Sequence, residues 1–172
     1  MTQEVVLVNE LDEVLGTLDK NEAHQKGLLH RAVSVVILNS KNEMLLQRRA
    51  TTKYHSASLW TNAACTHPYL NEPPIKAAER RLQQEMGIEL ELEFAFKFIY
   101  KVTLENGMIE NELDYVYFGV TDKLPVLNRD ETDDYKYINI TEIENEIQVN
   151  ANSYTEWFKI LLPQFISKFT KK

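Results

Sequence analysis

The chain of 172 residues is 44% hydrophobic and 26% charged, values typical of one globular domain, and it carries a net charge of −7. One cysteine excludes an internal disulfide framework. Because the N-terminus shows no targeting pattern and no apolar run approaches the roughly 20 residues of a membrane span, we expect a cytoplasmic protein with no membrane partner. The acidic charge argues against nucleic acid as a partner but leaves room for a small anion, and we expect a monomer or a weak dimer.

The first part of the chain predicts β-strands with one polar interruption. A hairpin is expected over residues 4–17, followed by a polar segment at 18–27. The β-branched residues of 31–38 lie on both alternating faces, which is typical of a central strand covered on both sides. A second strand is expected at 43–47 and a polar, basic loop at 48–58.

The stretch 60–68 contains the single cysteine, Cys65, and a histidine two residues later, His67. In an extended segment these two side chains point the same way, so a thiol and an imidazole would face one pocket. A lone cysteine is more often a small buried hydrophobic residue, however. The pair is therefore a candidate site that needs further support.

Residues 71–86 predict a helix. The prolines at 73 and 74 fit a first helical turn, and apolar side chains recur at helical spacing from Ile75 to Met86. Gly87 is placed to end the helix in the left-handed conformation.

Two long antiparallel strands are expected next, at 89–102 and 110–120, joined by a turn at 105–107. Apolar residues from Leu90 to Phe98 share one parity, which predicts that they lie on one face of the first strand.

The last part of the chain predicts a loop, a strand and two helices. The acidic end of the loop 124–134 is interpreted as a solvated face or a helix-flanking turn rather than a metal site. A strand at 135–140 and a short helix at 141–146 follow. Apolar spacing and a capping box at 153–156 then predict a C-terminal amphipathic helix over 153–170, which Pro163 could bend.

Three histidines and two glutamates form a candidate metal site. His24 and His30 flank the entry to the central strand, and His67 lies in the stretch 60–68. Glu110 and Glu112 alternate on one strand, so their carboxylates share a face. If these side chains converge, they suit Mn²⁺ or Zn²⁺, with Mg²⁺ a weaker fit because of the nitrogen ligands. Each of them alone is equally compatible with a surface or a satisfied core position.

Basic side chains near these segments form a candidate anion site, because arginine forks and lysine point charges are what a diphosphate requires. Arg80 and Arg81 are also compatible with a solvated helix face on which Arg81 pairs with Glu85 one turn later. The basic residues in question are Lys20, Arg48, Arg49, Lys53, Arg80 and Arg81.

Several short motifs follow one another in an order that resembles a known family. They are Leu29-His30-Arg31-Ala32-Val33-Ser34, Leu46-Gln47-Arg48-Arg49-Ala50, Trp60-Thr61-Asn62 with Cys65-Thr66-His67-Pro68, Ala78-Glu79-Arg80-Arg81-Leu82 with Glu85-Met86-Gly87, and Glu110-Asn111-Glu112. Together they resemble the type I isopentenyl-diphosphate isomerases, which have a Nudix-like fold. The resemblance implies one mixed α/β domain over 1–172, with a Nudix-like core at 30–140 in which helices sandwich a mixed β-sheet.

The Nudix box, G-x5-E-x7-R-E-U-x-E-E-x-G-U with U apolar, is present in a degenerate form. With the box aligned on Gly87, Thr66 replaces the opening glycine, and Arg81 and Gln84 replace two of the three helical glutamates. Nudix hydrolases use those glutamates to hold the metals that activate water, so their loss argues against diphosphate hydrolysis. A cationic Arg81 would instead favour binding a diphosphate intact.

The resemblance implies reversible conversion of isopentenyl diphosphate to dimethylallyl diphosphate through a carbocation-like species. Such a reaction needs an acid, a base and a dry pocket that tolerates a cation. Cys65 and Glu112 match the proton-transferring pair of the family, Tyr100 matches the tyrosine near the glutamate, and Trp157 matches the aromatic residue that stabilises the cation. Trp157 is also compatible with a plain core position on the terminal helix.

The resemblance also implies the ligands. His24, His30, His67, Glu110 and Glu112 match the metal ligands, and Lys20, Arg49, Lys53 and Arg81 match the positions that bind the diphosphate of a prenyl diphosphate substrate. Glu85, with the backbone carbonyl of Cys65, matches the residue that helps to hold a Mg²⁺ ion on the diphosphate.

Two departures from the family pattern concern the ligands and one loop. The sequence His55-Ser56-Ala57-Ser58 stands where many relatives have an aromatic-Pro-Gly turn, and we assign His55 to a loop without a function. His24 lies in a segment of variable length. The alternatives to an isomerase are a Nudix diphosphate hydrolase, a thiol hydrolase that uses Cys65 and His67, and a non-catalytic module that binds prenyl diphosphates.

Overall fold

Strand β3 is the centre of the sheet. The computed structural model describes residues 3–169, and within them β3 pairs with four other strands. The elements are β1 Glu4–Val8, β2 Val14–Asp19, α1 Lys20–Lys26, β3 His30–Leu38, β4 Glu43–Arg49, β5 Trp60–Thr61, β6 Ala64–Thr66, α2 Pro74–Met86, β7 Glu93–Thr103, β8 Ile109–Val120, β9 Thr132–Asn139, α3 Ile143–Val149, a 3₁₀ turn Ala151–Ser153 and α4 Glu156–Phe169.

The sheet is mixed. Strand β3 runs antiparallel to β1, β4 and β6 but parallel to β8, in a register that places His30 beside Glu112. Strand β8 in turn forms a long antiparallel hairpin with β7, and β9 pairs with β4. The parallel β3–β8 pair thus brings a histidine and a glutamate that are far apart in the sequence to the same end of the sheet.

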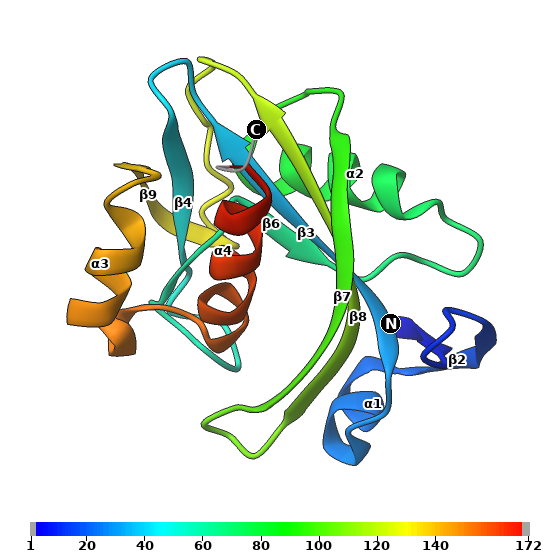
Figure 1. Ribbon diagram of the computed structural model, residues 1–172. Helices are drawn as coiled ribbons and strands as arrows, with labels where there is room; N and C mark the ends of the chain where they lie inside the picture. The colour runs from blue at the N-terminus through cyan, green and yellow to red at the C-terminus, as the bar shows by residue number, and fades with distance from the viewer. Residues whose placement is uncertain (1–2, 170–172) are drawn as a thin grey trace.

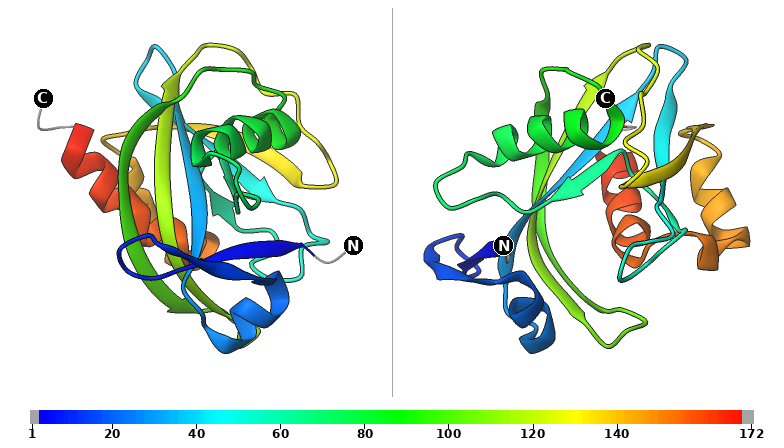
Figure 2. Two further views of the ribbon diagram at one scale, coloured as in Figure 1. Left: turned by 90° about the vertical axis from the view of Figure 1, so that its right-hand side faces the viewer. Right: turned by 180° about the vertical axis from the view of Figure 1, so that it is seen from behind.

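Helices cover both faces of the sheet, with α2 on one side and α3 and α4 on the other (Figures 1 and 2). Alternate residues of β3 face the two sides: Val33, Val35 and Ile37 pack in the cluster that contains α2, whereas Val36 packs with α4. This confirms the prediction of a central strand covered on both sides. The molecule is one mixed α/β domain, as predicted, and none of the helices in its described part has the length and apolarity needed to span a bilayer.

The polar segment at 18–27 contains a helix, α1, that the sequence reading did not include. The carboxylate of Asp19 accepts a hydrogen bond from the backbone N–H of Glu22 at 3.0 Å, which caps the helix, and Gly27 ends it with φ 63°. The helix has only seven residues and one buried apolar side chain, Ala23, so it has no apolar periodicity to detect.

The prediction that the apolar residues of the first long strand share one face was wrong. The register of β7 against β8 shifts between Phe94 and Phe96, so one extra residue reverses the alternation. As a result Phe94 is 54% exposed while Phe96 is 4% exposed and lies in the core beneath α4. The bulge turns the remainder of β7, including Tyr100, toward that core.

The last predicted elements begin at different residues from those expected. Strand β9 begins at Thr132, and the short helix α3 begins at Ile143 and ends at Val149. The C-terminal helix, expected over 153–170, begins at Glu156, because Tyr154 forms a β-bridge with Trp60 instead of entering the helix. Residue 170 lies outside the described part of the chain.

Candidate active site

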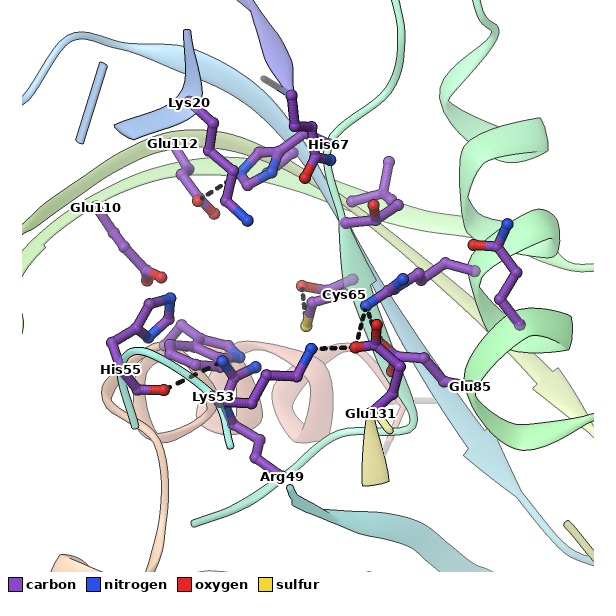
Figure 3. A pocket seen from close by; sticks show the side chains of 18 of the residues that line it. Lys20, Arg49, Lys53, His55, Cys65, His67, Glu85, Glu110, Glu112 and Glu131 are labelled. Carbon is purple, nitrogen blue, oxygen red and sulfur yellow. Dashed lines mark hydrogen bonds and ion pairs between the residues drawn. The ribbon is translucent and has the colours of Figure 1, made fainter. Parts of the chain in front are cut away.

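A pocket of about 680 Å³ is lined by nearly all the predicted site residues (Figure 3). The bulged strand β7, the hairpin partner β8, helix α1, the stretch 60–68, helix α2 and the N-terminal end of α4 all contribute side chains to it. Its lining includes Lys20, His24, Arg49, Lys53, Cys65, His67, Arg81, Glu85, Tyr100, Glu110, Glu112 and Trp157. The other predicted residue, His30, is fully buried and belongs to the same group of ligands as His24.

Three imidazoles converge on one carboxylate at the end of the β3–β8 pair. The Nε2 atoms of His24, His30 and His67 lie 3.8, 3.4 and 3.1 Å from Oε1 of Glu112. One ligand atom from each of the four residues lies within 4.8 Å of all the others. All four side chains are buried, so this is a formed group of possible metal ligands rather than an exposed acidic patch.

The hydrogen bonds of two of these rings show which nitrogen is free to bind a metal. Nδ1 of His24 lies 2.6 Å from the carbonyl oxygen of Lys20, and Nδ1 of His30 lies 2.8 Å from that of Leu28. A carbonyl only accepts, so Nδ1 is a donor in both rings, which leaves Nε2, the atom that faces Glu112, as the nitrogen that can bind a metal. Nε2 of His30 is buried without a hydrogen-bond partner. Two imidazole Nε2 atoms that face one carboxylate oxygen form an arrangement that a divalent cation satisfies, so the group is suited to hold a metal ion.

Glu110 lies beside this group but is not one of the four converging ligands. Its Oε2 atom accepts a hydrogen bond from Oη of Tyr100 at 3.0 Å, and the same hydroxyl lies 2.7 Å from Oε2 of Glu112. Burial and the charge of Glu112 raise the pKa of Glu110 well above its usual range. A cation close to both carboxylates would allow both to ionise.

Cys65 faces the same pocket from β6 and is held as a thiol. Its Sγ atom lies 3.2 Å from Nδ2 of Asn62 and 3.6 Å from Oγ of Ser34. Burial, with a further contribution from the nearby carboxylate of Asp114, raises the pKa of the Cys65 thiol. Because the ring of His67 pairs with Glu112, the predicted common orientation of Cys65 and His67 does not produce a thiol–imidazole pair.

Four basic side chains, Lys20, Arg49, Lys53 and Arg81, also line the pocket. Burial lowers the pKa of Lys20, and the charges of Lys53, Arg81 and Arg49 lower it further. Nη2 of Arg81 lies 2.6 Å from Oε1 of Glu85, as the alternative pairing predicted from the sequence requires. In Figure 3 Lys20 lies beside Glu112 and His67, whereas Arg49 and Lys53 lie across the pocket, and Cys65 lies between these two groups.

Sequence reasoning missed two residues of the pocket, His55 and Glu131. His55, assigned to a loop, is 8% exposed, and its ring packs edge-on against Trp157 with the centroids 5.9 Å apart. Glu131, assigned to a solvated acidic face, pairs with Lys53 and lies 2.7 Å from Arg81, so that interpretation was wrong for this residue. Neither residue belongs to a periodic segment, and only the charged residues around Glu131 and the polar residues around His55 could have drawn attention to them.

Comparison with known proteins identifies the family. The family profile described as NUDIX domain matches residues 28–158. A protein named isopentenyl-diphosphate Delta-isomerase from Pectobacterium atrosepticum is 48% identical over 157 residues, which are 91% of this chain and 88% of the relative. The chain belongs to the isopentenyl-diphosphate Delta-isomerase family. An isopentenyl-diphosphate Delta-isomerase 2 from Aromatoleum aromaticum is 44% identical over 97% of this chain and 88% of its own length.

Solved structures with the Nudix fold resemble this isopentenyl-diphosphate Delta-isomerase family member in architecture. A protein from Deinococcus radiodurans has a TM-score of 0.79 at 17% identity and covers 94% of this chain and 98% of its own. A MutT protein from Methanosarcina mazei Go1 has a TM-score of 0.67 at 19% identity, with 84% of this chain and 96% of its own covered. At these identities the likeness shows the fold alone, and it confirms the Nudix-like sheet predicted from the motifs.

Two residues at named positions of the Nudix box, Glu72 and Arg80, have a structural role in this isomerase family member. The carboxylate of Glu72 accepts hydrogen bonds from Nε and Nη2 of Arg80 at 2.8 and 2.9 Å, which fastens the segment before α2 to that helix. The next residue, Arg81, points into the pocket, where a hydrolase would carry a metal-binding glutamate. Of the two adjacent arginines, Arg80 therefore has a structural role, in its pair with Glu72, and Arg81 belongs to the site.

Proposed function

We propose that the enzyme interconverts isopentenyl diphosphate and dimethylallyl diphosphate, with Cys65 and Glu112 as the two groups that transfer protons. The observation that carries this proposal is that a protonated thiol and a carboxylate face one largely buried pocket from different strands. Moving an unactivated double bond requires a proton to be added at one carbon and removed at another. A neutral thiol and a carboxylate are the acid and base that such a transfer needs, and their roles exchange with the direction of reaction.

The pocket also offers an environment for the carbocation-like species. Trp157 is 4% exposed and lies in the lining, where its ring can face the reacting carbons. An aromatic face stabilises a desolvated cation by about 2 kcal/mol. The hydroxyl of Tyr100, hydrogen-bonded to Glu112, fixes the orientation of the carboxylate that exchanges the proton.

We assign the divalent ion to His24, His30, His67 and Glu112, with Glu110 as the adjacent fifth ligand. The nitrogen-rich set favours Mn²⁺ or Zn²⁺ over Mg²⁺. When bound, the ion supplies fixed positive charge that favours the ionised form of the glutamates. The buried Nε2 atom of His30, which has no hydrogen-bond partner, supports this assignment.

We assign the diphosphate of the substrate to the basic side chains of the pocket. Lys20, Arg49, Lys53 and Arg81 all line the pocket, and charge-assisted hydrogen bonds to phosphate are among the strongest that side chains make. Glu85 is 6% exposed beside Arg81 and, with the carbonyl of Cys65, is proposed to hold a Mg²⁺ ion that accompanies the diphosphate. The cytoplasmic location and the monomeric or weakly dimeric state stay predictions.

The alternative functions are less compatible with the site. A Nudix hydrolase needs glutamates where this chain has Arg81 and Gln84. A thiol hydrolase needs a base that activates Cys65, but the imidazole of His67 is hydrogen-bonded to Glu112 at 3.1 Å and the thiol stays protonated. A non-catalytic binding module would not need a buried acid and base on one pocket.

Incubation of the metal-loaded enzyme with isopentenyl diphosphate in heavy water tests the proposal. We expect dimethylallyl diphosphate as the product, with deuterium in both the product and the recovered substrate. Phosphate release without dimethylallyl diphosphate would instead establish a hydrolase. A trapped acyl-enzyme would indicate a thiol hydrolase, and tight binding with neither product nor exchange would indicate a binding module.

A further inference from the structure

Glu131 places a carboxylate among the cations assigned to the diphosphate. Its Oε2 atom lies 2.7 Å from Nη2 of Arg81 and also pairs with Nζ of Lys53 (Figure 3). The side chains of Glu131, Arg81 and Lys53 are 24%, 21% and 20% exposed, so the group lies at the mouth of the pocket and is mostly shielded from water. A carboxylate with these two partners makes the same contacts that a phosphate group would make.

The main chain of Glu131 is held in place, so only its side chain is free to move. Its carbonyl oxygen accepts a hydrogen bond from the N–H of Ala50 at 3.0 Å, and its own N–H donates to the carbonyl of Asn128 at 3.0 Å. The following residue, Thr132, is fully buried at the start of β9. Rotation of the Glu131 side chain would therefore free Lys53 and Arg81 without moving the loop.

The two cations differ in how they are held once Glu131 leaves. Nη2 of Arg81 keeps its contact with Glu85, which is itself fixed because its Oε2 atom lies 2.5 Å from Nε2 of Gln47. Lys53, in contrast, has no other ion pair among residues 3–169. Displacement of Glu131 thus leaves a positioned guanidinium and a fully available ammonium group facing the incoming anion.

We infer that the carboxylate of Glu131 mimics the substrate diphosphate in the free enzyme. It orders Lys53 and Arg81, and it lowers the affinity of the site for the anion. The inference rests on the proposed function, in which those two cations bind the diphosphate. The anion has to displace the carboxylate before it can use the same N–H donors. After displacement the negative charge of Glu131 stays near the site and repels the bound diphosphate. Glu131 therefore favours release of the product, and it also keeps Lys53 and Arg81 ordered when the site is empty.

Calorimetric titration of the enzyme with inorganic diphosphate and Mg²⁺ tests this inference. We expect Glu131→Gln to bind the anion about three- to tenfold more tightly, because the substitution removes the competing charge and keeps the shape of the side chain. Asp130→Asn is the matched control. Asp130 is the adjacent residue, is exposed at the mouth of the pocket and forms no ion pair with another residue in the part of the chain that the structure describes. Its loss should change the affinity less than twofold.

Two results separate failure of the inference from failure of the proposed function. Arg81→Ala should weaken binding of inorganic diphosphate, and unchanged binding would mean that the anion site itself is assigned wrongly. If Arg81→Ala weakens binding while Glu131→Gln binds no more tightly than Asp130→Asn, the inference is overturned and the anion site stands. Weaker binding by Glu131→Gln and Glu131→Ala would also overturn it, because Glu131 would then help to bind the anion or its Mg²⁺ ion.

Discussion

The hydroxyl group of Tyr100 lies 2.7 Å from Oε2 of Glu112, in the interior of the pocket. Burial, together with the charges of Glu110 and Glu112, raises the pKa of Tyr100 well above its usual value, so the hydroxyl stays protonated and acts as a donor. We expect Tyr100→Phe to lower kcat about 10- to 100-fold with little change in KM, because the glutamate loses its orienting donor while the anion site is untouched.

Steady-state kinetics with isopentenyl diphosphate measures this effect, and Tyr117→Phe is the matched control. Tyr117 is 5% exposed and lies in the other core cluster, which packs against α2. Removal of its hydroxyl should leave kcat within about twofold of the wild type. Equal effects of the two substitutions would show that Tyr100 contributes only to the packing of the core.

Cys65→Ser tests the proton-transfer role of the thiol. A serine hydroxyl is a much weaker acid than a thiol in the same buried position, so we expect kcat to fall at least about 1,000-fold. Binding of inorganic diphosphate, measured by calorimetry, should stay within about twofold of the wild type. Turnover near the wild-type rate would rule out Cys65 as a proton carrier, and the same test applies to Glu112→Gln.

Removal of one imidazole tests the metal site. We expect His30→Gln to contain less than about a tenth of the metal of the wild type after dialysis, because one of four converging ligands is lost. His55→Gln changes a buried histidine that lines the pocket but is not in the ligand group, and this variant should retain the metal. Metal content by inductively coupled plasma mass spectrometry distinguishes the two, and retention of metal by His30→Gln would contradict the assignment.

The sequence predicted those elements for which the pattern of neighbouring residues is enough to specify the structure. The β-branched run of β3, the prolines and apolar spacing of α2, and the left-handed Gly87 each specify their structure without help from distant residues. The β7 bulge was not predictable in this way. The phenylalanines alternate without interruption in the sequence, and the extra residue between Phe94 and Phe96 appears only in the pairing of β7 with β8. Helix α1 was missed because its stability comes from its caps rather than from an apolar stripe.

The site residues that lie within the sequence motifs could be predicted. His30 and Glu112 belong to separate motifs, and the parallel register of β3 and β8 makes them neighbours, which no local pattern shows. The roles of His55 and Glu131 depend on where two loops pack against the pocket. Neither loop has a periodic pattern, so the sequence left His55 in a loop without a function and Glu131 on a solvated face or in a helix-flanking turn.

The pKa of His55 predicts a loss of stability in acid. Burial, followed by the charges of Arg49 and Lys20, lowers the pKa of His55 to about 3 in the folded protein, against 6.5 for the unfolded chain. Between these values the unfolded chain binds the proton and the folded protein does not. The stability is therefore fully present above pH 6.5 and decreases as the pH falls, by at most about 1.4 kcal/mol per pH unit for one proton and by less where water screens the ring.

Urea unfolding of the chelator-treated protein at pH 7, 6 and 5 measures this dependence. The free energy of unfolding of His55→Gln should fall less steeply than that of the wild type over the same range, because glutamine binds no proton. The other histidines are common to both proteins, so the difference in slope belongs to His55. Parallel curves would show that the buried ring is protonated in the folded state.

Two glycines with similar backbone angles provide a test of local packing. Gly87, at the end of α2, has φ 63°, and a Cβ atom there would lie 2.8 Å from the carbonyl oxygen of Val126. Gly107, in the β7–β8 turn, has φ 80° and no heavy atom within 4 Å of an added Cβ. We expect Gly107→Ala to cost about 1 kcal/mol of folding free energy, the backbone term alone, and Gly87→Ala to cost about 2–4 kcal/mol because a backbone contact must also shift. Urea denaturation measures both, and equal losses would show that the loop at Val126 moves away freely.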